Sequence, residues 1–170
     1  RAERERGDLV PETHAEHRHA RSAALAPARI LGAHVLALEG HEAARLGVTV
    51  IPAVLVVDGK TYLDGQDFSR TQLYRQMASL DGLPTTAVPS PGSFIQAYEQ
   101  QLQAGASSIL SIHLAERLSG MIQTASQAAG EFDGRVEVVD SGQVSLGLGF
   151  QVLEAAAAAL AGAPLGIVRQ

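Results

Sequence analysis

The chain has 170 residues, of which 46% are hydrophobic and 18% are charged, and its formal charge at neutral pH is −5. These values favour one globular domain with a hydrophobic core, and they exclude a basic face or an aromatic platform for nucleic acid. The sequence has no cysteine for a disulfide or a thiolate metal site and no apolar segment long enough to span a bilayer, so we expect a cytoplasmic protein.

The first 40 residues carry no sustained apolar pattern. Residues 1–29 are mostly Arg, Glu, His and Ala with scattered Pro, which cannot bury enough surface to offset the entropy lost on ordering. We therefore expect residues 1–40 to be poorly structured and residues 41–170 to form the folded domain. Three histidines of the first segment have no fixed geometry, so we interpret them as solvated side chains and expect no metal site. They are His14, His17 and His19.

The folded part begins with a run of β-branched residues. Residues 48–57 predict one strand that is buried on both faces of a sheet, with a bulge or an edge at Pro52. After an Asp-Gly turn, residues 60–65 predict a short returning strand. Ser69 stands three residues before a glutamine, which is the spacing of a capping box, and predicts a helix through residue 80.

Helices and strands then alternate to the end of the chain. Ser90 as N-cap and Pro91 at the first helical position predict a helix that ends at Gly105. A strand, a helix, a second strand and an alanine-rich helix are predicted in turn over residues 108–113, 118–129, 135–140 and 144–161. This alternation predicts an α/β fold with a parallel, doubly wound, Rossmann-like sheet that has helices on both faces.

Ligands of such sheets bind in the loops at the carboxyl ends of the strands. The candidate loops are residues 85–90, 113–120 and 140–149. In the second loop, Ser119 and Gly120 offer a hydroxyl and bare backbone N–H groups at a helix N-terminus, where anions bind readily. A plain N-cap would use the same hydroxyl, and Thr86 in the first loop could equally serve ordinary turn hydrogen bonds.

Six segments of the chain resemble, in order and spacing, segments of the DegV family. They are residues 48–52, 58–65, 83–92, 109–113, 118–120 and 136–141, and the glycines of residues 145–150 also look like that family. The resemblance covers residues from about 45 to 170. It implies the N-terminal α/β domain of the two-domain DegV fold, with the C-terminal domain absent from this chain.

The resemblance implies a function as well as a fold. It implies a fatty-acid-binding protein of phospholipid metabolism, not an enzyme, that presents the carboxylate of a long-chain fatty acid to a fatty acid kinase subunit. By position, Thr86 and Ser119 would donate hydroxyl hydrogen bonds to the carboxylate, and the region of Gly120 would add backbone N–H groups. The fatty acid is the ligand, no cofactor is implied, and we expect a monomer.

The chain departs from the family pattern in several places. Ala87 stands where the family has a serine, and Ala115, Glu116 and Met121 stand at positions that usually carry hydroxyls, so the site has fewer polar contacts. The family's opening strand, which ends in Asp-Ser, and its second domain are not recognised. A truncated gene product with a foreign or misread start would account for both, and the loss of a pocket wall would weaken binding.

Two alternatives to fatty-acid binding stay open. One is a small hydrolase or transferase with Ser119 as nucleophile, His113 as base and Asp140 as the acid that orients it. Ser119 does not lie in a Gly-x-Ser-x-Gly elbow, so we favour lipid binding. The other alternative is a folded remnant that binds nothing.

Overall fold

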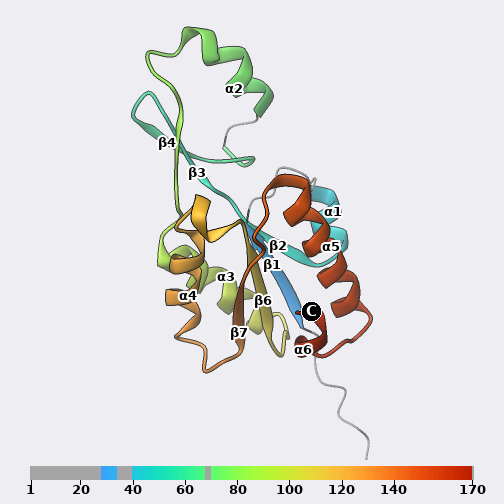
Figure 1. Cartoon of the computed structure of the whole chain (residues 1–170). Coiled ribbons are helices and arrows are strands. Elements are labelled where there is room, and N and C mark those ends of the chain that lie inside the picture. The colour runs from blue at the N-terminus through green and yellow to red at the C-terminus, as the bar shows by residue number, and fades with distance from the viewer. Residues whose placement is uncertain (1–27, 34–39, 68–69, 170) are drawn as a thin grey trace, which may run out of the picture.

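A parallel sheet forms the centre of the molecule (Figure 1). The structure is a computed structural model, and it describes residues 28–33, 40–67 and 70–169. The sheet has four strands in the order β2-β1-β6-β7, and every neighbouring pair is parallel. The strands are β1 (Arg29–Ala33), β2 (Val48–Ile51), β6 (Ile109–His113) and β7 (Val136–Asp140).

Helices cover both faces of this sheet, as Figure 1 shows. One face carries α1 (Gly40–Arg45), α5 (Ser145–Leu160) and α6 (Leu165–Val168), and the other carries α3 (Pro91–Gln103) and α4 (Met121–Ala129). Alternate residues of β6 point to opposite faces, so Leu110 and Ile112 pack with α5 while Ile109 packs with α3 and α4. The doubly wound α/β fold expected from the sequence is confirmed.

A smaller antiparallel sheet builds a lobe that projects from the main body (Figure 1). The projecting lobe, residues 54–87, contains β3 (Val54–Val57), β4 (Lys60–Leu63) and β5 (Thr85–Ala87) in the order β4-β3-β5. It also contains α2 (Arg70–Gln76) and a 3-10 turn, η1 (Met77–Ser79).

The prediction of one strand over residues 48–57 is wrong. β2 ends at Ile51 and β3 begins at Val54, so the two halves of the run join different sheets. Pro52 lies between them, and proline has no N–H to donate to a sheet, so the ladder stops there. The returning strand is confirmed as β4, whereas Thr85 and Thr86 lie in a strand rather than a loop.

The prediction that residues 1–40 are poorly structured is wrong for residues 29–33. These residues form β1, an inner strand paired with β2 and β6, and Leu31 is fully buried. Five residues are too few to show a period, and in parallel pairing the partners of β1 lie far along the chain. His14, His17 and His19 lie outside the described residues, as does Ser69 with its predicted capping box.

The other predicted elements agree with the structure to within a few residues. The Ser90 side chain caps α3 by accepting a hydrogen bond from the Ser93 N–H, and Pro91 is the first helical residue. α4 begins three residues later than predicted, because a 3-10 turn, η2 (Glu116–Leu118), comes before it. No helix in the described part of the chain is long and apolar enough to cross a membrane.

Candidate functional site

The loop after β6 lies where the strand order of the parallel sheet reverses. From β1 the chain passes to β2 on one side, and it then returns to β6 on the other side of β1. In open α/β sheets, ligands bind outside the carboxyl ends of the strands at such a reversal. The fold therefore places residues 114–120 at the position where this architecture usually binds its ligand.

Ser119 and Gly120 lie at the start of α4, as expected. Gly120 is the N-cap residue and offers no side chain, while Ser119 Oγ accepts a hydrogen bond from the Met121 N–H at 3.3 Å. The first backbone hydrogen bond of the helix runs from the Thr124 N–H to the Gly120 carbonyl, so the N–H groups of residues 122 and 123 precede it. The Ser119 hydroxyl thus has a capping role and stands beside N–H groups that suit an anion.

The strand that carries Thr86 ends close to Gly120. Thr86 is exposed and pairs with Leu55 of β3. Two residues further on, a Val88 methyl lies 3.7 Å from the position that a side-chain carbon on Gly120 would take. The structure therefore brings together the two segments that carry the predicted site residues.

Buried polar groups lie beneath this loop, on the α3 side of β6. Tyr98 OH and Ser111 Oγ share a hydrogen bond of 2.9 Å, and Ser111 Oγ shares another of 2.7 Å with His113 Nε2. All three residues are fully buried. Burial lowers the pKa of His113 to about 4 and raises the pKa of Tyr98 to about 12, so both are neutral at pH 7. His113 Nδ1 has no hydrogen-bond partner among the described residues.

The three residues of the alternative catalytic hypothesis each form hydrogen bonds with groups outside the hypothetical triad. His113 Nε2 bonds to Ser111, Ser119 Oγ bonds to a backbone N–H, and Asp140 Oδ1 accepts from the backbone N–H groups of Glu116 and Gly142. A nucleophile and its base must lie within hydrogen-bond reach of each other. The structure therefore does not assemble Ser119, His113 and Asp140 into a catalytic triad.

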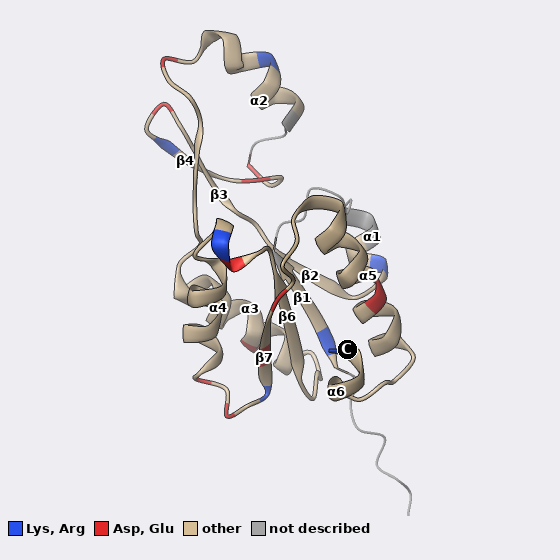
Figure 2. Ribbon diagram, in the orientation of Figure 1, with Lys and Arg blue, Asp and Glu red and all other residues tan. Residues whose placement is uncertain are grey.

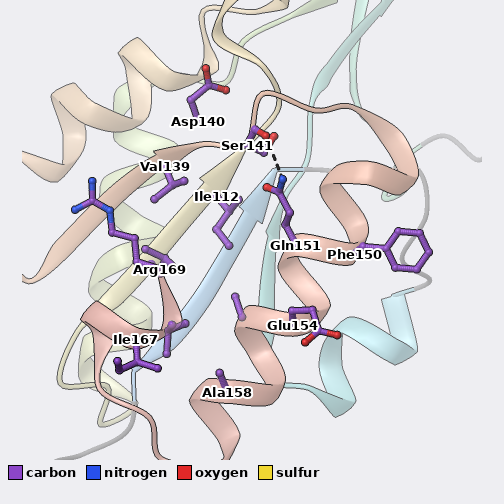
Figure 3. A pocket seen from close by; sticks show the side chains of 13 residues that line it. Ile112, Val139, Asp140, Ser141, Phe150, Gln151, Glu154, Ala158, Ile167 and Arg169 are labelled. Carbon is purple, nitrogen blue, oxygen red and sulfur yellow. Dashed lines mark hydrogen bonds between the residues drawn. The ribbon is translucent and has the colours of Figure 1, made fainter.

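A cavity of about 580 Å³ lies on the opposite face of the sheet, between the strands β6 and β7 and the helices α5 and α6 (Figure 3). Ile112 and Val139 form part of its apolar floor, and Asp140 and Ser141 lie at the loop end. The Gln151 amide closes part of that end by donating to the Ser141 carbonyl at 3.2 Å. This cavity is separated by the sheet from the α3 side on which His113 lies.

A second cavity of about 580 Å³ lies between α3 and the base of the projecting lobe. Among the residues that the structure describes, no charged side chain lines it, and Val54 and Leu63 contribute from the lobe. In the register of β3, Val54 pairs with Ala87 while its neighbour Leu55 pairs with Thr86. Thr86 therefore points to the other face of the small sheet, so its hydroxyl is not part of this cavity.

Lys and Arg residues are scattered singly over the described chain, as Figure 2 shows. Within residues 28–33, 40–67 and 70–169, no three His, Cys, Asp or Glu side chains come together in a way that could hold a metal ion.

These features define a doubly wound α/β protein in which the start of α4 and the Ser119 hydroxyl lie where the strand order reverses. The family described as "Uncharacterised protein, DegV family" matches residues 35–170. The chain belongs to the DegV family, and the match begins somewhat before the predicted boundary.

Curated relatives support this assignment. A DegV domain-containing protein of Deinococcus radiodurans is 45% identical over 119 residues, which are 70% of this chain and 42% of that protein. A DegV domain-containing 15.5 kDa protein of Staphylococcus aureus is 42% identical over 105 residues, 62% of this chain and 74% of that protein. The chain spans less than half the length of most of the curated relatives it matches.

Solved structures of the family share the fold. A DegV family protein from Thermus thermophilus, described as fatty-acid binding, is 34% identical and superposes with a TM-score of 0.77 over 84% of this chain and 50% of its own. DegV of Bacillus subtilis, described as a fatty acid binding protein, is 24% identical with a TM-score of 0.73, and covers 84% of this chain and 51% of its own. The latter similarity supports the fold alone.

Two features of the site are absent from the sequence-based prediction. The spacing of Ser111 and His113 places both on one face of β6, but nothing in the sequence pairs that face with Tyr98. The only role that the sequence suggests for the Asp140 side chain itself is that of an orienting acid, whereas its carboxylate accepts hydrogen bonds from two backbone N–H groups. An Asp followed two residues later by Gly is a turn signal that could have indicated this role.

Proposed function

We propose that this chain binds a long-chain fatty acid and that the hydroxyls of Thr86 and Ser119 hold its carboxylate, with N–H groups at Gly120 and the start of α4. The observation that carries the proposal is the similarity to the Thermus protein described as fatty-acid binding, at 34% identity over 84% of this chain. The position of Ser119 beside bare N–H groups supports it, because these groups can bind a carboxylate without a buried cation.

We further propose that the bound carboxylate is presented to a fatty acid kinase subunit. Thr86 and Gly120 are exposed and Ser119 is half-buried, so a carboxylate held there stays accessible to a second protein. Thr86 lies in the strand β5, and Ser119 and Gly120 lie in the loop that leads into α4. None of the three lines either of the two cavities of about 580 Å³. A ligand group in such a position suits transfer chemistry by a partner.

Removing either hydroxyl should weaken fatty-acid binding. A hydrogen bond to a charged group contributes about 1.5 to 3 kcal/mol, so we expect Ser119→Ala and Thr86→Val each to raise the Kd for palmitate by about 10- to 100-fold. Equilibrium binding of radiolabelled palmitate to the purified chain would measure this change. Lipid extraction and mass spectrometry of the same preparations would show whether a fatty acid copurifies.

Matched controls are available for both variants. Ser126→Ala changes an exposed serine about two turns further along α4, and Thr85→Val changes the exposed neighbour of Thr86 that points to the opposite face of β5. Both controls should bind palmitate as the unmodified chain does. Unmodified chain that neither copurifies with nor binds a fatty acid would contradict the proposed function and favour the folded remnant.

Presentation to a kinase predicts an acyl phosphate product. With ATP and a purified fatty acid kinase subunit, the palmitate-loaded chain should support formation of acyl phosphate, trapped as the hydroxamate with hydroxylamine. Palmitate without the chain should give little product, because the carboxylate is then not oriented for transfer. Equal product with and without the chain would leave binding intact and rule out presentation.

A further inference from the structure

The turn that follows β7 is bonded to the loop that carries Ser119. Asp140 is the last residue of β7, and its Oδ1 accepts hydrogen bonds from the Glu116 N–H at 3.2 Å and the Gly142 N–H at 2.9 Å. One carboxylate oxygen thus joins two loops that are 24 residues apart in the sequence.

Backbone hydrogen bonds reinforce this contact on both sides. The Ala115 N–H donates to the Gln143 carbonyl at 2.9 Å, and the Ser141 N–H donates to the His113 carbonyl at 3.0 Å. Within the turn, the Gln143 N–H donates to Ser141 Oγ at 3.1 Å. Residues 140–143, which we call the β7 turn, therefore form a rigid support for residues 113–116.

The position of Ser119 depends on Glu116. Glu116 begins the 3-10 turn η2, and the Ser119 N–H donates to the Glu116 carbonyl at 3.3 Å. The Glu116 side chain also accepts from the Gln123 amide of α4 at 2.7 Å. A shift of the Glu116 backbone would therefore move the Ser119 hydroxyl relative to the N–H groups of α4.

We propose that Asp140 is a positioning residue of the candidate carboxylate site, a role that rests on the proposed function. Its carboxylate acts through the Glu116 N–H: it fixes residues 114–120 so that Ser119 Oγ and the start of α4 point at one ligand group. The acceptor oxygen, and not the negative charge, performs this role. A charge near an anionic ligand would by itself oppose binding.

Variants of Asp140 separate the acceptor from the charge. Asp140→Ala removes both, and we expect it to raise the Kd for palmitate about tenfold. Asp140→Asn keeps an oxygen at the Oδ1 position and removes only the charge, so it should bind within about threefold of the unmodified chain. Glu131→Ala, which removes an exposed carboxylate just beyond the far end of α4, is the matched control and should change nothing.

A second variant removes the donor instead of the acceptor. Ala115 has an extended ψ of 126°, which suits a residue that precedes proline. Glu116 is the first residue of the 3-10 turn η2, so a proline at position 116 is compatible with the backbone. Glu116→Pro should weaken palmitate binding as much as Asp140→Ala does, and the double variant should be no weaker than either. Glu116→Ala loses only the side-chain contact to Gln123, so the difference in Kd between Glu116→Pro and Glu116→Ala measures the loss of the N–H group.

Amide hydrogen exchange tests the same role without a ligand. The Glu116 and Ser119 N–H groups should exchange faster in Asp140→Ala and at the original rate in Asp140→Asn. Equal weakening by Asp140→Asn and Asp140→Ala, or normal binding by Glu116→Pro, would overturn the proposal. If the unmodified chain binds no palmitate, the proposed function fails. Exchange that is unchanged in Asp140→Ala then overturns the positioning role separately, and faster exchange at both groups supports it.

Discussion

Tyr98→Ala should lower the free energy of unfolding by about 3–5 kcal/mol, the usual range for truncating a large buried aromatic side chain. Tyr98 is fully buried, its ring meets that of Phe132 edge-on at 5.5 Å, and it lies 6.2 Å from the ring of Phe94. It also holds α3 to β6 through Ser111. Since whole domains are stable by about 5–15 kcal/mol, the loss would be a large fraction of the total. Urea denaturation followed by circular dichroism would measure it.

Two comparisons give this prediction its controls. Tyr98→Phe keeps the ring and loses only the hydroxyl, so we expect it to cost about 1 kcal/mol. Tyr74→Ala removes a tyrosine of α2 that is 68% exposed and should change the free energy of unfolding by less than about 0.5 kcal/mol. A Tyr98→Ala variant no less stable than Tyr74→Ala would show that α3 is not anchored through this residue.

The stability of the chain should fall as the pH is lowered from about 6.5 to about 4. The folded state holds His113 neutral because burial lowers its pKa to about 4, whereas an unfolded histidine titrates near 6.5. Between these values the unfolded state binds the extra proton, so acid favours unfolding. At 1.36 kcal/mol per pKa unit, the total loss is about 3 kcal/mol, and above pH 6.5 this contribution is fully present.

His113→Gln provides the test, because glutamine is polar but does not titrate. The free energy of unfolding would be measured in urea at several pH values for both chains, and their difference should change over this interval. An NMR titration of the His113 ring should show a midpoint near 4. Parallel stability curves, or a midpoint near 6.5, would contradict the buried neutral state.

Local signals predicted most of the main body. The N-cap serine and proline at Ser90 and Pro91 fixed the start of α3, and the alternation of apolar strands with helical segments indicated the parallel sheet. The helices form their backbone hydrogen bonds between residues close in sequence, and the apolar residues of these elements recur with a clear period. Such signals depend only on neighbours in the sequence, so they can be read without the fold.

The elements that sequence reasoning missed depend on distant partners. β1 is short and becomes a strand because β2 and β6 flank it, and β5 is three exposed residues that pair with β3 across the lobe. The candidate site shows the same division. Ser119 at a helix start could be recognised from its own loop, but the role of Asp140 depends on a backbone group 24 residues away.

The projecting lobe carries Thr86, while Ser119 lies on the main body. Neither hydrophobic cluster found among the described residues includes any residue of 54–87, so opening of the lobe disrupts mainly the lobe's own contacts. Segments with few core contacts open locally at a smaller free energy than the whole domain. A ligand that formed hydrogen bonds to both hydroxyls would join the projecting lobe to the more stable main body. The free energy of binding would then also stabilise the lobe against local opening.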